Sequence, residues 1–296
     1  RHTRLLTQSR GLGDVYKRQA LYYNALIAAR NMAEAIGDDT HRSFYDSRIA
    51  AIRQAYQENY WKDGFYSSDP AQFKDDRTNA LAILVGLADE SKYQSIVDNV
   101  LVPNHFASPH FEWIVYDAMA IAGRYEDSLR RMKIRYDEQV SDATRSTLSE
   151  YLTGYSAGRG TENHAWNAPA TVLSKHIAGV APTSVGWATF AVMPNMAHMT
   201  RIKQVVPSVQ GTISVELART PTEFTMDLQS PEGTQVTIGI PKLYFNIREI
   251  SVNNKRVWSS GRFEPKISGV TWAGEDDKYY MLHVDAGSWA IKATAE

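Results

Sequence analysis

The residues best suited to chemistry lie in one polar stretch, TLSEYLTGYSAGRGTENHAWN, which runs from Thr147 to Asn167. Its candidates for chemistry are a carboxylate, an amide, an imidazole and aromatic rings, at Glu150, Asn163, His164, Tyr151 and Trp166. A carboxylate can activate water, and a Trp ring can pack on the apolar face of a sugar. Polar loops that carry aromatic residues are also frequent binding sites. An ordinary loop with a capping Glu and a core-edge Trp has the same composition, so spacing alone favours neither interpretation.

Two further polar groups stand at the predicted starts of helices. Residues 75–77, Asp-Asp-Arg, precede a helical segment, where acidic side chains usually cap the helix or offset its dipole; a substrate contact is the less favoured interpretation. Phe111, Glu112 and Trp113 follow Pro109 in the first turn of another helix. A Glu is ordinary in a first turn, but this triplet could also line a pocket.

The composition excludes several classes of protein. The chain has 296 residues, a formal net charge of −1 and no cysteine. The near-neutral balance and the absence of a basic run interleaved with aromatic residues argue against nucleic acid as a partner. No apolar run reaches the roughly 18 residues that a membrane helix requires. The scattered histidines and the lack of thiols give no reason to expect a metal site, and the lack of cysteine leaves the cellular compartment open.

The elements that must position these residues begin with helices. Seven segments of the first half have helical periodicity: residues 20–36, 40–56, 78–87, 91–102, 109–123, 125–136 and 166–177. Thr40 is an expected N-cap, and Gly37, Gly123 and Gly179 are expected at helix ends. A turn-rich aromatic segment separates the second and third helices.

The first 19 residues differ from the rest of the chain. They are basic, contain Gly11 and Gly13, and show no clean period. The string GLGDVYKRQ resembles translated sequencing-adaptor tails, so residues 1–19 are expected to be non-native and are set aside from fold reasoning. On this interpretation the natural chain begins upstream of Ala20, and the present chain is a fragment.

A loose repeat runs through the helical half. An Ala-rich helix ends near a Gly and a more charged helix follows, as in AEAIGDDTH, ILVGLADESK and AIAGRYEDS. Such pairs predict an array of α-hairpins, either an open solenoid or a closed α/α toroid; a plain helical bundle is the simpler alternative. In a toroid, the loops at residues 60–76, 104–113 and 141–166 would meet at a common pocket.

Near Pro182 the period changes from about 3.6 to 2, which predicts strands. The segments WATFAVMP, TISVELA, TEFTMDL, TQVTIGI, IREISVN, RVWSS, GVTWAG, YYMLHVD and SWAIKAT alternate or are β-branched. Turn signals between them include Pro207 and Pro231-Glu232-Gly233. We therefore expect a helical domain over residues 20–185 and an all-β sandwich of about a hundred residues over 186–296.

The sequence also resembles a known family. The segment ASPHFEWIVYDAMAIAGRYEDSLRRMKIRYDEQVSDATRSTLSEYL is similar to the stretch of bacterial α-L-rhamnosidases, glycoside hydrolase family 78, in which an SPYFEFYVLEAL…AGRYDEAL helix pair leads to a TTFWE motif. The segment TENHAWNAPATVLSKHIAGVAPTSVGWATFAVMPN resembles the SxCHGWSAGPTxxLxxxVLGVRPTSPGFxxFxVxP that follows it. The resemblance covers roughly Ala20 to the C-terminus. It implies an (α/α)6 barrel, incomplete here, followed by a β-sandwich.

The resemblance also implies a function and roles for residues. It implies inverting hydrolysis of terminal α-L-rhamnose, from rhamnosides or plant polysaccharides. Glu150 matches the family's general base, His164 its active-site histidine and Trp166 the adjacent aromatic residue. Phe111, Glu112 and Trp113 match a turn that lines the pocket. Tyr151 and Asn163 are the other residues expected to bind substrate.

Two departures from the family pattern bear on activity. Ser149 stands where the family has a Trp before its general base, so one sugar-packing surface is missing or comes from elsewhere. The family's general acid lies in a DCPxRxE-type motif that has no counterpart here. Inversion requires both an acid and a base. We therefore expect this chain alone to be inactive and the intact protein to be the enzyme.

Two alternative functions stay open. One is another inverting (α/α)6 glycosidase of the trehalase or fucosidase kind, and the other is a non-catalytic carbohydrate-binding protein. The expected partner is a glycan or glycoside that contains L-rhamnose, and the chemistry requires no cofactor. On family grounds, a periplasmic or extracellular location is favoured over a cytoplasmic one.

Overall fold

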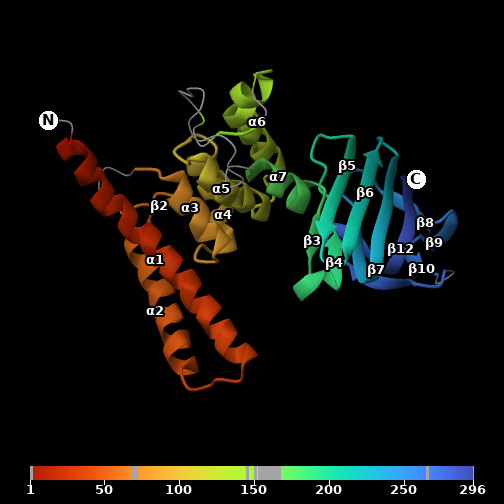
Figure 1. Cartoon of the computed structure of the whole chain (residues 1–296), viewed down its shortest axis with the longest axis horizontal. Coiled ribbons are helices and arrows are strands. Elements are labelled where there is room, and N and C mark those ends of the chain that lie inside the picture. The colour runs from red at the N-terminus through yellow and green to blue at the C-terminus, as the bar shows by residue number, and fades with distance from the viewer. Residues whose placement is uncertain are drawn as a thin grey trace. The chain divides into compact units, whose positions relative to one another are not determined.

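The computed structural model describes residues 3–68, 73–144, 147–149, 152, 168–264 and 267–295, with backbone alone for residues 3–14. The chain forms two compact units, Arg1–Pro169 and Ala170–Glu296 (Figure 1). The second unit begins ahead of the boundary expected at residue 185, and a strand of its sheet already starts at Val180. No helix among the described residues has the length and apolar character that a membrane crossing requires.

The first unit is helical, as predicted, and α7 leads into the second unit. Seven α-helices are described: α1 (Thr3–Ala35), α2 (Arg42–Tyr60), α3 (Asp76–Leu84), α4 (Tyr93–Ile96), α5 (Pro109–Ile121), α6 (Tyr125–Ser141) and α7 (Ala168–Val172). Helix α4 follows a 3-10 turn (Glu90–Lys92) and continues as a π-helical turn (Val97–Leu101), and α7 also continues as one (Leu173–Ile177). A short hairpin, β1 (Trp61–Lys62) with β2 (Phe65–Tyr66), lies in the aromatic segment before α3.

Two details of the predicted helices are wrong. Helix α1 starts at Thr3 and not at Ala20, and it continues through Gly11 and Gly13. Thr40 does not cap α2, because the residue before that helix is His41 and no side chain caps it. Thr40 is itself held by Asp38, whose Oδ1 accepts the Thr40 N–H at 2.9 Å. The predicted ends are confirmed, since Gly37 and Gly123 follow α1 and α5 with φ of 71° and 75°.

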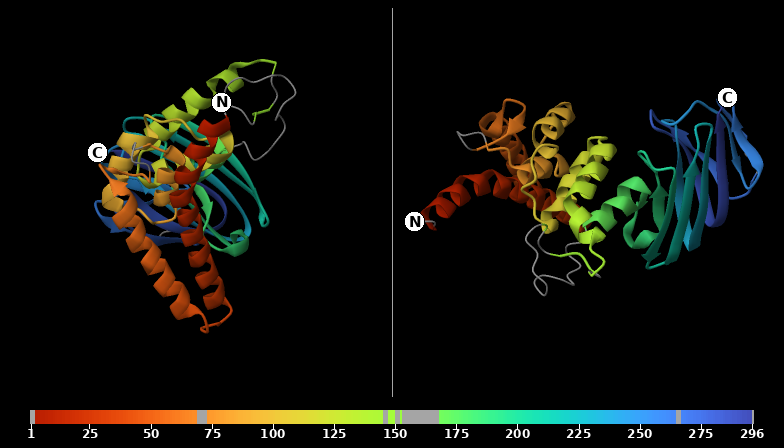
Figure 2. Two further views of the ribbon diagram at one scale, coloured as in Figure 1. Left: turned by 90° about the vertical axis from the view of Figure 1, so that its left-hand side faces the viewer. Right: turned by 90° about the horizontal axis from the view of Figure 1, so that it is seen from above.

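The helices pack as antiparallel pairs around the apolar helix α5. In Figure 1 and in the left view of Figure 2, α1 and α2 lie side by side and antiparallel. Helix α5 packs against α3 and α6, and α3 packs against α1. All side chains from Ile114 to Ala120 of α5 are buried, so this helix forms the centre of the unit. Tyr16 of α1 is 1% exposed and lies 6.5 Å, between ring centroids, from Tyr56 of α2. The arrangement is part of the predicted α/α toroid.

The second unit is a mixed β-sheet domain of ten strands in which two long strands do most of the pairing. The strands are β3 (Val180–Pro182), β4 (Thr189–Val192), β5 (Arg201–Ser208), β6 (Gly211–Arg219), β7 (Glu223–Pro241), β8 (Ile247–Val252), β9 (Lys255–Ser259), β10 (Arg262–Phe263), β11 (Val270–Glu275) and β12 (Tyr279–Ala295). The first half of β7 pairs with β6 and its second half with β4, while β12 pairs with β7 along both halves. The first half of β12 pairs with β11 and the second with β8.

The pairing defines two groups of strands that share β7 and β12. The β12–β7 register shifts between Asp285 and Gly287, and residues 231–234 of β7 face this shift. On one side of it the order is β5-β6-β7-β12-β8-β9-β10, and on the other it is β3-β4-β7-β12-β11. Apolar residues from both groups form one core, among them Phe190, Met226, Ile238 and Leu282.

The strand predictions need several corrections. TEFTMDL and TQVTIGI are halves of the single strand β7, and YYMLHVD and SWAIKAT are halves of β12, because Pro231-Glu232-Gly233 shifts the register without ending the strand. Strands β3, β5 and β10 were not predicted. Pro207 lies inside β5 and is not a turn residue. It is tolerated there because, among the described residues, β5 pairs with β6 alone and its other edge makes no ladder bonds.

Gly179 gives a test of the packing in this unit. Its φ is 76°, and a Cβ built there would lie 2.2 Å from the carbonyl carbon and oxygen of Met193. Gly186 has a similar φ of 69°, but a Cβ there would meet nothing within 4 Å. Gly179→Ala should lower the free energy of unfolding by the left-handed strain of about 1–2 kcal/mol plus roughly 1–3 kcal/mol for the clash. Gly186→Ala should show the strain alone.

Thermal unfolding of both variants, followed by the β-sheet signal in circular dichroism, measures the difference. Equal losses in the two variants would show that the Met193 backbone moves aside without penalty.

Candidate active site

Five of the predicted site residues lie outside the described part of the chain: Glu150, Tyr151, Asn163, His164 and Trp166. Their predicted roles therefore stay predictions. The two described residues that flank the Glu150-Tyr151 pair are both buried, since Ser149 is 0% and Leu152 8% exposed. The Ser149 N–H donates to Oε1 of Gln139, a residue of α6, at 2.7 Å. Helix α6 thus holds the backbone at the position before Glu150.

The other three predicted site residues occupy the first turns of α5 and have three different surroundings. Phe111 is half-buried, lies against the core of the helical unit, and has the Lys17 Nζ 5.8 Å from its ring centroid. Glu112 is fully buried. Trp113 is 38% exposed. Of the triplet, Trp113 presents the most surface for a substrate contact, and the predicted contacts themselves stay predictions.

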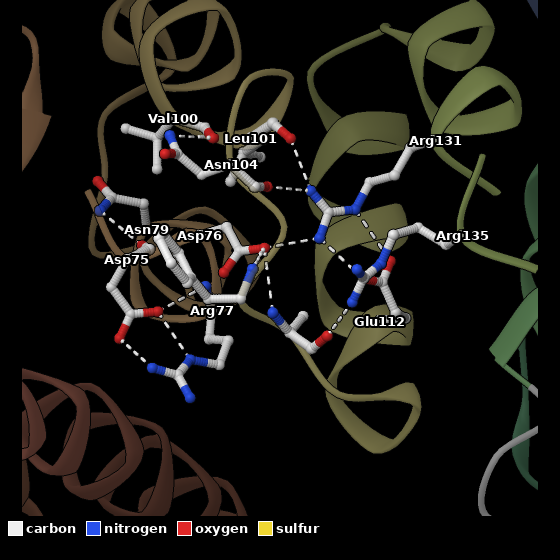
Figure 3. A network of polar contacts seen from close by, with 12 residues as sticks. Asp75, Asp76, Arg77, Asn79, Val100, Leu101, Asn104, Glu112, Arg131 and Arg135 are labelled. Atoms are coloured by element: carbon white, nitrogen blue, oxygen red, sulfur yellow. Dashed lines mark hydrogen bonds and ion pairs between the residues drawn. The ribbon is translucent and has the colours of Figure 1, made fainter. Parts of the chain in front are cut away.

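Glu112 belongs to a buried cluster of charges centred on Arg131 of α6 (Figure 3). The Arg131 Nε donates to Glu112 Oε2 at 2.9 Å, and Nη2 donates to Glu112 Oε1 at 2.8 Å and to Asp76 Oδ2 at 2.6 Å. Nη1 donates to the carbonyl oxygens of Leu101 at 2.7 Å and Asn104 at 2.6 Å. A guanidinium group has five N–H donors, so these bonds use all of them.

The two acidic residues at the start of α3 have separate roles. Asp75 is the N-cap of α3, and its Oδ1 accepts from the Arg77 backbone N at 3.0 Å and from its Nε at 2.8 Å, as the capping interpretation predicted. Asp76 instead reaches across to the loop before α5, where its Oδ2 accepts from the N–H groups of Phe106 at 3.1 Å and Ala107 at 3.3 Å. Burial raises the pKa of Asp76, and Arg131 opposes that shift.

One face of α6 reaches both the loop before α5 and the segment after α6. Arg131, Arg135 and Gln139 are spaced four residues apart and therefore lie on one side of the helix. Arg135 donates to Glu112 Oε1 at 3.0 Å and to the carbonyl oxygen of Ala107, while Gln139 holds Ser149. Sequence analysis missed these three residues because a charged helix with such spacing is usually a solvated face.

The same contacts bring two of the predicted loops together. Phe73, before α3, and Phe106, before α5, have ring centroids 4.7 Å apart. The loops at residues 60–76 and 104–113 therefore meet at one end of the helix array. His105 lies beside this junction. Burial lowers its pKa, and the neighbouring Arg131 and Arg135 lower it further, which favours a neutral imidazole at pH 7.

This cluster has a structural role. Asp76 and Glu112 have no exposed surface and accept hydrogen bonds from arginine, so neither is placed to exchange a proton with a substrate. Within the described part of the chain, no group of three or more His, Asp or Glu side chains could hold a metal ion. The cluster joins α3, α5 and α6 and fixes the backbone of the loop that carries Phe106.

Replacing Arg131 should destabilise the helical unit. Arg131→Met leaves the buried Asp76 carboxylate without its cation and Glu112 with Arg135 alone, so we expect the free energy of unfolding to fall by about 3–5 kcal/mol. The matched control is Arg130→Met, because Arg130 is 65% exposed and pairs with Asp127 at the surface. A surface pair contributes about 0–1 kcal/mol. Urea unfolding followed by the helical signal measures both, and similar losses would contradict a central role for Arg131.

Comparison with known proteins shows what this chain resembles. Residues 179–250 match the family model described as bacterial alpha-L-rhamnosidase C-terminal domain. A search of curated protein sequences gave no match. Solved structures show a similar fold for the α-L-rhamnosidase of Dictyoglumus thermophilum (TM-score 0.74, 18% identity) and for that of Streptomyces avermitilis complexed with L-rhamnose (TM-score 0.69, 14% identity). The family 78 rhamnosidase of Bacillus sp. GL1 has a TM-score of 0.63 at 23% identity.

The coverage of these structures shows which region is shared. They cover 93%, 93% and 75% of this chain, whereas the chain spans 31%, 26% and 26% of their own lengths. At such identities the likeness shows the fold alone, and the family model matches residues 179–250 of the β domain. Together they confirm the predicted resemblance: this chain is similar to the C-terminal region of the α-L-rhamnosidases of glycoside hydrolase family 78, with part of the helical barrel followed by the β-sheet domain.

Proposed function

We propose that the intact protein is an inverting α-L-rhamnosidase, which releases terminal L-rhamnose from rhamnosides or plant polysaccharides. The observation that carries the proposal is the family match at residues 179–250, joined to a rhamnosidase fold over 93% of the chain. One of the structures with this fold was determined with L-rhamnose bound, which supports the choice of sugar.

In the proposed mechanism Glu150 is the general base. An inverting glycosidase activates a water molecule on the face of the sugar opposite the leaving group, and a carboxylate removes the proton from that water. The bond from the Ser149 N–H to Gln139 supports this assignment, since it ties the neighbouring backbone to a rigid helix. His164 would lie in the same site, and Trp166, Tyr151 and Asn163 would contact the sugar.

The general acid must come from another part of the intact protein. Inversion requires a second carboxyl group to protonate the leaving oxygen. The two acidic residues at the centre of the described cluster, Asp76 and Glu112, are both buried and bonded to Arg131, so neither is suited to that task. The family's acidic motif also has no counterpart in this sequence.

Replacing the proposed base tests the mechanism. In the intact protein, Glu150→Gln should lower kcat on p-nitrophenyl α-L-rhamnoside by about 10²–10⁴-fold, because an amide cannot accept the proton, while L-rhamnose binding is retained. Glu34→Gln, at an exposed position on α1, is the control and should leave turnover unchanged. Unaltered turnover in the Glu150 variant would favour a protein that binds carbohydrate without catalysis, or a different base.

The present chain should lack turnover of its own. Without a general acid, the purified 296-residue chain is expected to release no L-rhamnose from methyl α-L-rhamnoside, whose alkoxide leaving group must be protonated as it departs. A panel of nitrophenyl glycosides on the intact protein then separates a rhamnosidase from another inverting glycosidase of the same fold. Turnover of the rhamnoside by the chain alone would show that the acid lies within these residues.

A further inference from the structure

A polar hollow lies on one face of the β-sheet unit, over strands β5, β6, β7 and β12, which pair side by side in this order (Figure 1). Its volume is about 340 Å³, within the range of about 300–1,000 Å³ that small-molecule sites occupy. The polar side chains of these four strands that line it are Lys203, Ser214, Glu216, Asp227, Gln229 and Ser288. The hollow is therefore a candidate site built from described residues of one unit.

The strand register explains why these side chains gather on one face. It sets them in two rows across the sheet, Lys203–Glu216–Asp227 and Ser214–Gln229–Ser288. Val215 of β6 and Leu228 of β7, which lie between the two rows in the sequence, are buried in the core. Because side chains alternate between the faces of a strand, both polar rows point away from the core. Neighbouring strands lie about 4.8 Å apart, so one sugar ring can reach several of these groups.

Short side chains on β12 make this face concave. Ala290 pairs with Asp227 of β7, and Ser288 pairs with Gln229. On the other side of β12 the hollow is lined by Asn253, in the turn between β8 and β9. The Asn253 side chain is anchored, since its Oδ1 accepts the Ala290 N–H at 2.8 Å. The space over Ser288 and Ala290 thus lies between fixed polar groups on both sides.

Several polar groups of the hollow are not used by the fold. Among the residues that the structure describes, four side chains of the hollow make no hydrogen bond or ion pair with the protein: Ser214, Asp227, Gln229 and Ser288. They offer two hydroxyl groups, an amide and a carboxylate, which together both donate and accept. Sugar hydroxyl groups also do both, so this set of groups matches a sugar better than a ligand of one polarity.

The charges of the hollow favour an uncharged ligand. Glu216 Oε1 accepts from Arg201 Nε at 3.1 Å, and Glu216 Oε2 lies 3.7 Å from Lys203 Nζ, so both neighbouring cations already have a carboxylate partner. Asp227 adds a second carboxylate, which repels an anion. No cluster of His, Asp and Glu in the described part of the chain, in this hollow or elsewhere, is suited to a metal ion.

We propose that the polar hollow of the β-sheet unit is a binding site for an uncharged sugar residue of a glycan. The site binds without reacting, and it holds the sugar through its hydroxyl groups. A second contact on the same glycan chain raises the effective concentration of the chain at any other site of the protein. The inference goes beyond the proposed function and does not rest on it, so an intact protein without rhamnosidase activity would leave it standing.

An NMR titration of the isotope-labelled 296-residue chain tests the site. Methyl α-L-rhamnoside and methyl α-D-galactoside are the uncharged probes. Methyl α-D-galacturonoside is the matched anion, because it differs from the galactoside only in a carboxylate at the last carbon. We expect the uncharged glycosides to shift the side-chain amide signals of Gln229 and Asn253 with a Kd on the order of millimolar. The galacturonoside should bind at least about tenfold more weakly.

Two variants locate the site by different means. Asp227→Ala removes a carboxylate that accepts from sugar hydroxyl groups and should raise Kd about tenfold or more. Ala290→Phe leaves every polar side chain in place but fills the hollow with a ring, so it should abolish binding. The control is Thr212→Ala, an exposed position two residues before Ser214 on the same face of β6 and outside the hollow, which should keep the wild-type Kd.

Each result decides for or against the site. Weakened binding in both variants with an unchanged control supports it. Wild-type affinity in both variants, equal or tighter binding of the galacturonoside, or no amide shift in the wild type with either uncharged glycoside would overturn it. The amide spectrum of each variant reports its fold. Should the ring of Ala290→Phe disturb the sheet, Asp227→Ala decides, because Asp227 is exposed and its removal leaves no buried gap.

Discussion

The helical unit depends on one buried cation. The guanidinium group of Arg131 reaches carboxylates on α3 and α5, the carbonyl oxygen of Leu101 at the end of the π-helical turn, and that of Asn104 in the loop before α5, so all these segments share a single side chain. Burying charges is unfavourable unless each one is paired and hydrogen-bonded. Here the pairing is complete for Arg131, and the geometry of the loop before α5 follows from it. The fold thus uses an ion pair where an apolar contact would leave the loop backbone without partners.

Much of the fold follows from periodicity and capping in the sequence. The first residues of α5 and α6, Pro109 and Tyr125, and the change to strands near Pro182 were predicted as observed, because apolar spacing and flanking Gly or Pro residues act locally. The start of α1 was missed because Gly11 and Gly13 are poor helix residues, yet tertiary packing of Tyr16 lies just beyond them. Strand β5 was missed because Pro207 signals a turn unless the strand is known to lie at an edge.

In the candidate site, too, some features could be predicted from the sequence and others could not. Asp75 could be recognised as a cap from its position alone, and the loops that meet could be inferred from the repeat. The roles of Asp76, Glu112 and Arg131 could not, because each depends on a partner 19 to 55 positions away in the sequence. Nothing local separates a buried arginine from the exposed Arg130 beside it. The candidates from Glu150 to Trp166 came from a family resemblance, and the structure describes only the residues that flank them.

The sharing of β7 and β12 between the two groups of strands has a consequence for how the β domain comes apart. Neither group can separate from the other while these strands stay intact, since each group contains one half of both. Loss of pairing on one side of the register shift therefore removes support from the other side. The domain is built to melt as one cooperative unit, and a local defect near either edge lowers the stability of the whole sheet.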